Sequence, residues 1–512
     1  MRTLILDCIE HFHVDQSERA ITLDLPDIQS FILYPVGFPH ARFSFFHIDD
    51  AARGRAFVAA VAELVSDATL PPFVDGKPVP KPSEVTVAFT YRGLAALEVP
   101  EHSLHSFPQD FAQGMRARAR ELLADRGAND PEHWEQVWRT DRVHVWVAVQ
   151  ANTLDELTRL QTRVLECARA NGVELLEVQE SQALVTKPGG DFTSKEHFGY
   201  TDGIGDPEIE GSGWPRIRGR GKWDEKRNDW VPIAAGEFVL GYRDEAGELP
   251  RAPLPIGLAR NGSFMVYRKL HQNVAKFRAF IQGEGAKFAG GPEFLAAKLM
   301  GRWRNGTPLI AAPDAPAEGA PLPEVPQSEL TNFRYNEDKE GGRCPMGSHI
   351  RRANPRDSLG FHGVLVDQRR IVRRGVPYGT WIPETTPLDE AARLDHFDDE
   401  HPSQHGVVFM AINASIERQF EFVQREWMNY GNDFRQGNDR DPITGARDAD
   451  DRMVIQGSIE KHTRDDRDVM EVRPPHICRG LEQFAVTRGG AYFFLPGLTA
   501  LRLIGAGRVE SA

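Results

Sequence analysis

One histidine in a cluster of arginines is the feature of this sequence best suited to chemistry. His349 follows a Pro-Met-Gly turn, and the run that it opens must end before Pro355, since the residue before a proline is driven out of the helical region. Three arginines lie close to His349 in the sequence: Arg351, Arg352 and Arg356. A rigidly held imidazole among cations suits a metal whose cofactor carries negative groups. A basic helix start with a surface histidine is the plainer alternative.

An aspartate in a glycine-rich turn offers a second reactive group. Asp202 lies in Gly199-Tyr-Thr-Asp-Gly203, where glycines let the backbone approach a flat cofactor closely and a loop presents the carboxylate. Such a carboxylate is suited to general base catalysis. Two alternatives stay open from the residues alone: an Asx turn, or a metal-binding loop completed by Asp206 and Glu208.

A pair of adjacent arginines supplies a third group. Arg373 and Arg374 lie in the segment Arg370-Ile-Val-Arg-Arg-Gly-Val-Pro-Tyr-Gly379. If the segment is a strand, the two side chains point to opposite faces, so only one of them serves a given site. A fixed guanidinium stabilises negative charge that develops on an oxygen better than lysine does.

These three segments together resemble the signature motifs of dye-decolourising peroxidases. The sequence Cys-Pro-Met-Gly-Ser-His-Ile-Arg-Arg-Ala-Asn-Pro-Arg at 344–356 is similar to the family's proximal-histidine segment. Residues 199–203 resemble its distal Gly-x-x-Asp-Gly motif, and residues 370–379 resemble the segment with its distal arginine. The aspartate motif alone is weak, but the three in this order are specific. The resemblance covers most of residues 20 to 505 and is closest to the long-chain members.

The resemblance implies a haem peroxidase and a role for each of the three residues. His349 would be the axial ligand of the iron in haem b, Asp202 the base that moves a proton between the peroxide oxygens, and Arg373 the charge that stabilises the departing oxygen. The enzyme would reduce hydrogen peroxide and oxidise dyes and phenolic or other aromatic donors in one-electron steps through an oxoferryl intermediate, with an acidic optimum. The alternative is a haem carrier or sensor that binds haem without turnover.

Further haem contacts follow from the same resemblance. An acceptor on the second ring nitrogen makes a proximal imidazole electron-rich, and Glu421 is expected to fill this role, with Glu417 in reserve. Val407 and Phe409, on one face of an expected strand, resemble the family's apolar distal wall. The propionates need cations, for which there are three unranked candidates: Arg351, Arg352 and Arg356.

Two aromatic residues are candidates for electron transfer to donors too bulky to reach a buried haem. Tyr378 matches a position where some members of the family carry a redox-active tyrosine. Trp427 is the second candidate, although its position on one apolar stripe with Phe420 and Val423 favours a packing role.

Histidines and aspartates elsewhere form no recognisable metal motif. The spacings of four histidines fit no standard zinc pattern, so surface positions are expected for His362, His396, His401 and His405. The acidic segment 438–451 lacks the glycine and the terminal glutamate of an EF-hand loop and is expected to be a solvated loop.

Composition narrows the class of protein. The chain of 512 residues is long enough for more than one domain or a duplicated core. Its net charge of -13 argues against a nucleic-acid or anionic-membrane partner, and no apolar run reaches the roughly 18 residues that cross a bilayer. Asp7 interrupts the first apolar run too early for a signal peptide, so a cytoplasmic protein is expected, of undetermined oligomeric state. Four dispersed cysteines form no disulfide framework: Cys8, Cys167, Cys344 and Cys478.

Periodicity predicts alternating strands and helices in both halves of the chain, which is typical of an α+β fold. The expected strands are 28–36, 85–89, 143–149, 173–179, 238–242, 264–267, 407–412 and 492–495. The expected helices are 57–65, 108–125, 154–165 (after a capping box at Thr153) and 416–428. We expect an N-terminal domain at 1–195, a linker with the distal motif at 196–235 and a C-terminal domain at 236–512. The resemblance implies two ferredoxin-like halves with antiparallel sheets, and haem held between them or within the C-terminal half.

Overall fold

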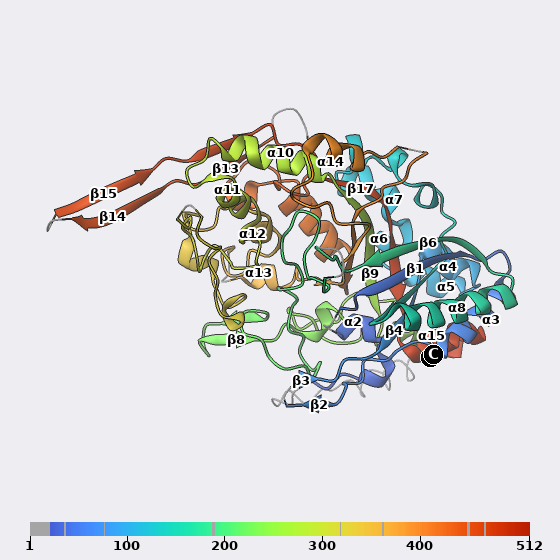
Figure 1. Cartoon of the computed structure of the whole chain (residues 1–512). Helices are drawn as coiled ribbons and strands as arrows, with labels where there is room; N and C mark the ends of the chain where they lie inside the picture. Colours follow the sequence, from blue (N-terminus) through green and yellow to red (C-terminus); the bar gives the residue numbers. More distant parts are fainter. Residues whose placement is uncertain are drawn as a thin grey trace.

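One antiparallel sheet forms the centre of the computed structural model (Figure 1). Its strands follow the order β10-β12-β9-β17-β4-β5-β1-β6, and β11 also pairs with β12. The structure describes residues 21–511 except 35–36, 76, 187–189, 318, 361–362, 399, 448–450 and 465–466. For residues 458–471 and 511 it describes the backbone alone.

The first half of the sheet has the strand order of a ferredoxin-like unit. Its strands β1 (His40–His47), β4 (Ser83–Phe89), β5 (Val145–Ala151) and β6 (Glu174–Gln182) lie in the order β4-β5-β1-β6, all antiparallel. Helix α3 (Ala51–Ala62) lies between β1 and β4 in the chain, and α8 (Leu154–Ala170) lies between β5 and β6. The two helices contact each other, and α8 packs on the strands.

The second half repeats this order with later strands. Here β9 (Ser263–Gln272) lies between β12 (Gly406–Asn413) and β17 (Ala485–Leu495), while β10 (Val372–Arg373) and β11 (Val376–Tyr378) pair with the outer edge of β12. The halves join where Phe494 of β17 pairs with Phe89 of β4, and β11 lies beside β6 at the other end. The predicted pair of ferredoxin-like antiparallel halves is confirmed.

Helices and long loops of the C-terminal half cover one face of its strands. They include α10 (Val274–Gly285), α11 (Gly291–Met300), α12 (His349–Ala353) and a π-wound helix in two parts, Glu417–Glu421 and Val423–Met428. A hairpin of β14 (Ser458–Arg464) and β15 (Arg467–Arg473) projects far from this body (Figure 1). The last long helix, α15 (Leu498–Ala506), packs against α3 of the first half.

Strong local patterns predicted the central elements correctly. The expected strands 85–89 and 143–149 correspond to β4 and β5, and the Thr153 hydroxyl caps α8 by accepting from Glu156 N. The expected helix 416–428 has the predicted extent, although it is wound as a π-helix. The predicted domain boundaries at 195 and 235 fall between β6 and β9 and stay a prediction.

Two expected strands are wrong. Within the expected strand 28–36, the described residues 28–34 contain the short helix α2 (Ser30–Leu33), and the Gln29 side chain bonds to Val87 and to the Pro496 carbonyl, where β4 meets β17. The first strand is instead His40–His47. Residues 238–242 follow a 3₁₀ turn and include Gly241 at φ +89°, which breaks an extended chain.

The expected helix 108–125 is interrupted. Gly114, at φ +76°, separates α6 (Gln109–Gln113) from α7 (Met115–Leu122), because a left-handed residue ends a helix. Among the described residues, no helix combines the length and the hydrophobicity that a bilayer crossing requires. The first residues of the chain, on which the signal-peptide prediction depends, lie outside the described residues.

Candidate active site

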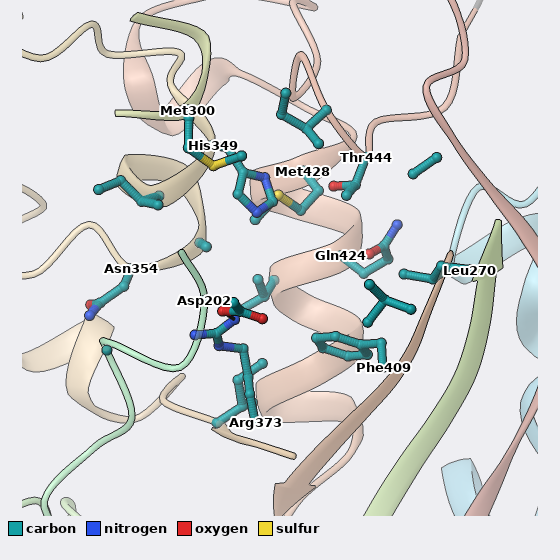
Figure 2. Close-up of a pocket in the computed structure, with 18 of the residues that line it drawn as sticks. Asp202, Leu270, Met300, His349, Asn354, Arg373, Phe409, Gln424, Met428 and Thr444 are labelled. Carbon is teal, nitrogen blue, oxygen red and sulfur yellow. Dashed lines mark hydrogen bonds and ion pairs between the residues drawn. The ribbon is translucent and has the colours of Figure 1, made fainter. Parts of the chain in front are cut away.

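A cavity lies between strands β9 and β12 and the helices that pack on them (Figure 2). The loop at 198–205 and the segment 370–373 close it from another side. Its apolar wall includes Phe198, Leu270, Met300, Val407, Phe409, Phe420, Val423 and Met428. Three groups able to do chemistry face the same cavity, as the sequence predicted: Asp202, His349 and Arg373.

His349 opens α12 and directs its ring into the cavity (Figure 2). The helix has only 5 residues and stops before Pro355, as the sequence predicted. The ring donates through Nδ1 to the carboxylate of Asp441, at 3.1 Å from each oxygen. Because this bond fixes the proton on Nδ1, the lone pair lies on Nε2. His349 therefore has the arrangement of an imidazole prepared to bind a metal.

Asp441 is the acid that sequence reasoning missed. It lies within the segment expected to be solvated, yet the residue is fully buried. Its carboxylate also accepts from Ile443 N and from the Thr444 N and Oγ1 atoms, so a tight turn holds it in place. Burial opposes ionisation, but His349 and the turn outweigh it and hold the pKa of Asp441 well below its usual range. In return, this carboxylate raises the pKa of His349 against the opposing effect of burial.

The expectation that Glu421 accepts from the proximal histidine is wrong. Its carboxylate instead receives Arg118 Nε at 2.7 Å, Arg118 Nη2 at 2.6 Å and Tyr492 OH at 2.8 Å. The backbone N–H of the reserve candidate, Glu417, donates to Asp110 Oδ2 at 2.8 Å. Glu421 thus joins the helix 417–428 to α7 and β17, and its role there is structural.

Asp202 and Arg373 form an ion pair across the cavity from His349 (Figure 2). Arg373 Nη1 donates to Asp202 Oδ1 at 2.7 Å, and Gly203 N donates to the same oxygen at 2.7 Å. Gly203 adopts φ +77°, a conformation that favours glycine after the aspartate. Burial raises the pKa of Asp202, but Arg373 and the Gly203 amide outweigh it, so the carboxyl stays ionised below its usual pKa. A charged base and a fixed cation thus face the imidazole.

The neighbouring arginine has another role. Arg374 bonds to Asp206 at 3.0 Å and to the Phe31 and Ile32 carbonyls of α2, away from the cavity. The choice of Arg373 over Arg374 therefore agrees with the geometry. The metal-loop alternative finds no support, because Asp206 is paired with Arg374 and Glu208 with Arg216.

The distal wall agrees with its prediction. Val407 and Phe409 alternate along β12 and line the cavity, while Val408 and Met410 point into the core on the other face. Phe409 also packs against Phe420, with ring centroids 6.2 Å apart. The period of the strand thus separates cavity residues from core residues.

Two of the three arginines expected at the propionates have other partners. Arg351 bonds to Asp338 and to the Cys344 carbonyl, and its guanidinium stacks on Tyr335. Arg352 donates to the carbonyls of Gly347, Trp427 and Asp439. Neither arginine lines the cavity, so the expectation that they bind the propionates is wrong. Both side chains point into the protein, where they hydrogen-bond to the surrounding loops.

Arg356 does line the cavity, together with arginines that the sequence did not single out: Arg268, Arg302 and Arg370. Arg356 donates to the Gly219 and Thr331 carbonyls and stacks on Phe333, with burial lowering its pKa to about 9. Arg268 pairs with Asp125 at 2.5 Å. The sequence did contain a sign of Arg268: the charged pair Arg268-Lys269 interrupts an apolar strand. Charged side chains in such a strand are buried only when they have partners, which points to a site beside them.

The two aromatic candidates are buried. Tyr378 is 2% exposed, on the far side of β12 from the cavity, and its hydroxyl bonds to Ser403 at 2.6 Å. Trp427 is also 2% exposed; its ring packs with Phe422 and Phe434, and its Nε1 donates to Asp433 at 3.0 Å. The packing role expected for Trp427 is confirmed, and an electron-transfer role for either residue stays a prediction.

The histidines expected at the surface divide into two groups. His396 and His401 are exposed, with 69% and 64% of their side chains accessible, as predicted. His405 is only 2% exposed, so that expectation is wrong: it immediately precedes β12 and points into the protein, where Asp395 accepts from its Nε2. His362 lies outside the described residues.

Comparison with known proteins decides the family. Residues 27–183 match the model of the DyP dimeric alpha+beta barrel domain. A dye-decolorizing peroxidase of Mycetinis scorodonius is 30% identical over 501 residues, which cover 94% of this chain and 88% of that protein. The chain belongs to the dye-decolourising peroxidase family. A multifunctional dye peroxidase of an Amycolatopsis species is also similar, 29% identical over 90% of this chain and 91% of its own length.

Solved structures of dye-decolourising peroxidases share the fold along most of the chain. One, in complex with 2,6-dimethoxyphenol, is 25% identical, with a TM-score of 0.70 over 94% of this chain and all of its own. Another, from Auricularia auricula-judae, is 24% identical with the same TM-score and shares the fold. The predicted family, the long-chain type and the peroxidase function are confirmed.

The cavity fits the haem on which dye-decolourising peroxidases depend. His349 offers Nε2 as an axial ligand, the wall is largely apolar, and cations line it. Arg268 is the clearest sign: it is 3% exposed, and its Nε and Nη1 atoms have no hydrogen-bond partner among the described residues. Buried guanidinium nitrogens are normally satisfied, and a carboxylate group of a cofactor would satisfy these.

Proposed function

We propose that this peroxidase holds haem b through His349 and reduces hydrogen peroxide between that haem and the pair Asp202–Arg373. The observation that carries the proposal is the bond from His349 Nδ1 to the buried Asp441, opposite the Asp202–Arg373 ion pair in one cavity. A proximal imidazole with a carboxylate acceptor is electron-rich, which favours cleavage of the O–O bond. A haem held there would supply the two electrons that reduce peroxide, one from the iron and one from the porphyrin.

Asp202 and Arg373 have separate roles in the reduction of peroxide. The Asp202 carboxylate accepts a proton from one peroxide oxygen and returns it to the departing oxygen, so that water leaves. Arg373 holds Asp202 ionised through the 2.7 Å bond and stabilises the charge on the departing oxygen. Val407 and Phe409 contribute an apolar wall to the same cavity.

We propose Arg356 and Arg268 as the cations for the haem propionates. Both line the cavity and both are buried. Arg268 has two unpartnered nitrogens, while Arg356 uses Nη1 for three backbone carbonyls. Replacing each by methionine and measuring haem dissociation tests the assignment.

Phenolic and other aromatic compounds are the proposed electron donors, since a related peroxidase was solved in complex with 2,6-dimethoxyphenol. Large dyes would be oxidised at a distance from the haem, with the buried residues Tyr378 and Trp427 as relays. The net charge of -13 supports the absence of a nucleic-acid partner. Cytoplasmic localisation stays a prediction, which fractionation of the source cells tests.

The test is the absorption spectrum of the purified protein before and after one equivalent of hydrogen peroxide, and again after a phenol. We expect a Soret band that changes with peroxide and returns to its first form as the phenol is consumed. A Soret band that is indifferent to peroxide would favour a haem carrier or sensor without turnover. Failure to bind haem at all would reject the proposal.

A further inference from the structure

A second cluster of ligating side chains lies on the opposite face of β9 from the active site. Leu270 and Gln272 line the active-site cavity, so His271 between them points to the other face of the strand. There it meets His405 and Asp395, and one ligand atom of each residue lies within 4.8 Å of the others. All three are buried, at 1%, 2% and 7% exposure. The active-site mechanism uses none of them.

The hydrogen bonds of His271 leave one ring nitrogen free. Nδ1 lies 2.7 Å from the Ser403 hydroxyl, whose oxygen accepts a ring proton there. Nε2 is buried and has no hydrogen-bond partner among the described residues, although the Asn273 amide lies nearby. Burial lowers the pKa of His271 well below its usual value, and His405 and Arg488 add to this effect. The imidazole is therefore neutral, which is the form that binds metals.

Asp395 is held in place by the start of a helix. Its Oδ2 accepts from Ala275 N, in the first turn of α10, at 2.7 Å. Its Oδ1 accepts from His405 Nε2 at 2.8 Å. One oxygen of the carboxylate is thus anchored to the backbone, while the other faces the two imidazoles. A cation that replaces the shared proton would bind both groups of this pair.

A third imidazole, that of His197, lies beside the cluster, outside the group of three residues whose ligand atoms lie within 4.8 Å of one another. The ring of His197 lies 5.4 Å from that of His405, and its Nε2 donates to the Tyr378 carbonyl at 2.9 Å. Its Nδ1 is buried without a hydrogen-bond partner among the described residues. Burial lowers the pKa of His197 to about 3, so this imidazole is neutral as well.

His271 and His197 have the hydrogen-bond pattern that is typical of metal-binding histidines. In metal sites, a histidine typically donates its second ring nitrogen to an oxygen acceptor, which fixes the ring and directs the other nitrogen at the ion. Both residues have such an acceptor and an unsatisfied nitrogen on the other side. Buried polar atoms without partners are rare, and two in one cluster call for an explanation.

Charge balance agrees with a divalent ion. Arg488 stacks on Phe397, and the Phe397 ring packs against His271 with centroids 4.4 Å apart. The charge of Arg488 disfavours a protonated His271 ring and also opposes a bound metal ion. A carboxylate ligand is therefore needed to offset this charge. Asp395 supplies that carboxylate. Nitrogen-rich sites of this kind suit Zn²⁺ and its neighbours rather than Mg²⁺ or Ca²⁺, which prefer oxygen ligands.

We propose that His271, His405 and Asp395 bind a divalent transition-metal ion of the Zn²⁺ class, separate from the haem iron. The ion would tie β9 to the start of β12 and to the segments that carry α10 and α14 (Leu388–Leu394).

The experiment uses the untagged, haem-containing full chain. Protein stripped with a chelator is dialysed against zinc, and bound zinc is counted by elemental analysis beside the haem iron, while zinc-edge X-ray absorption reports imidazole ligands. We expect one zinc ion per chain with nitrogen scatterers, and about a tenfold or greater loss of zinc affinity in Asp395→Asn and His271→Gln. Asparagine keeps an oxygen for Ala275 N, so the α10 contact survives.

His401→Ala is the matched control, since it removes an exposed histidine from the same loop. It should bind zinc as the wild type does, with an unchanged Soret band. Absence of stoichiometric zinc, copper, nickel, cobalt or manganese in the wild type overturns the proposal. So does zinc binding that Asp395→Asn and His271→Gln leave unchanged. If these variants do not fold, the stoichiometry and the absorption edge of the wild type decide alone.

Discussion

The His349 ring donates through Nδ1 to the carboxylate of Asp441, and each carboxylate oxygen lies 3.1 Å from that nitrogen. The two residues are 92 positions apart in the chain, and the bond joins α12 to a turn that follows the helix 417–428. Asp441 is buried, and its carboxylate also accepts hydrogen bonds from the backbone N–H groups of Ile443 and Thr444, so it cannot turn away from the ring. The charge behind the proximal imidazole is therefore fixed, and it sets the electron density at Nε2.

Replacing Asp441 by asparagine should weaken the enzyme at the iron without unfolding it. Asparagine still offers an oxygen to Nδ1 and to the turn, but it removes the negative charge. We expect the reaction with peroxide to slow by about 10- to 100-fold and the reduction potential of the haem iron to rise. Stopped-flow kinetics and a spectroelectrochemical titration measure the two effects. An unchanged potential would remove Asp441 from the role assigned to it.

Replacing Asp202 by asparagine removes the proposed base. General base catalysis contributes about 10²- to 10⁴-fold, so the second-order reaction with peroxide should slow by that factor while the Soret band of the resting enzyme persists. Stopped-flow measurement under excess peroxide tests this expectation. A rate within a factor of about two of the wild type would show that another group moves the proton.

Replacing Arg373 by leucine should move the acid limb of the pH profile. In the wild type the arginine holds the pKa of Asp202 below its usual value, so the ionised base, and with it the fast reaction, persists as the pH falls through the ordinary carboxyl range. Without the cation, burial raises the pKa of Asp202, and the rate should fall off at a higher pH than in the wild type. Arg374→Leu is the control: it breaks the pair with Asp206 and should leave the limb where it is.

The reactive residues could be predicted from sequence, because each lies in a short motif that carries its own turn. Gly203 supplies the positive φ beside Asp202, and Pro355 ends the helix of His349. Their partners could not be predicted in the same way. Asp439 and Asp451 of the same acidic segment are buried as well, so only the fold, which brings Asp441 to the His349 ring, singles it out. Glu421 lies on an apolar helical stretch, as a buried acid would, but its carboxylate pairs with Arg118 and not with the histidine.

The same limit explains the errors at the periphery of the site. Arg351 and Arg352 have the composition of propionate ligands, yet a five-residue helix directs them into the protein rather than into the cavity. His405 has the sequence context of a surface histidine, and only the pairing of β12 with β9 reveals that it lies beside His271. Local patterns identified β4, β5 and α8, whereas tertiary contacts decide which side chains meet.

Replacing Glu421 by glutamine should lower stability and leave the chemistry of the iron intact. The carboxylate is 4% exposed and receives two hydrogen bonds from Arg118 and one from Tyr492, so its loss leaves a buried guanidinium without its counterion. Breaking a buried pair in this way costs about 3–5 kcal/mol. Chemical denaturation monitored by the Soret band measures the free energy of unfolding. A shift of the reduction potential comparable to that of Asp441→Asn would restore Glu421 as a partner of the proximal histidine.

Replacing Trp427 or Tyr378 by phenylalanine separates peroxide chemistry from the oxidation of bulky donors. Both residues are buried, so a large dye reaches neither ring directly, and an electron that uses them must pass through the protein. Phenylalanine keeps most of the packing but removes the oxidisable indole or phenol. If the relay role holds, the rate with peroxide and the turnover of a small phenol stay at the wild-type level, while the turnover of a bulky anthraquinone dye falls.

A matched control is Trp303→Phe, which removes a buried indole that lies outside the cavity wall. Equal dye turnover in all three variants and the wild type would exclude both residues as relays.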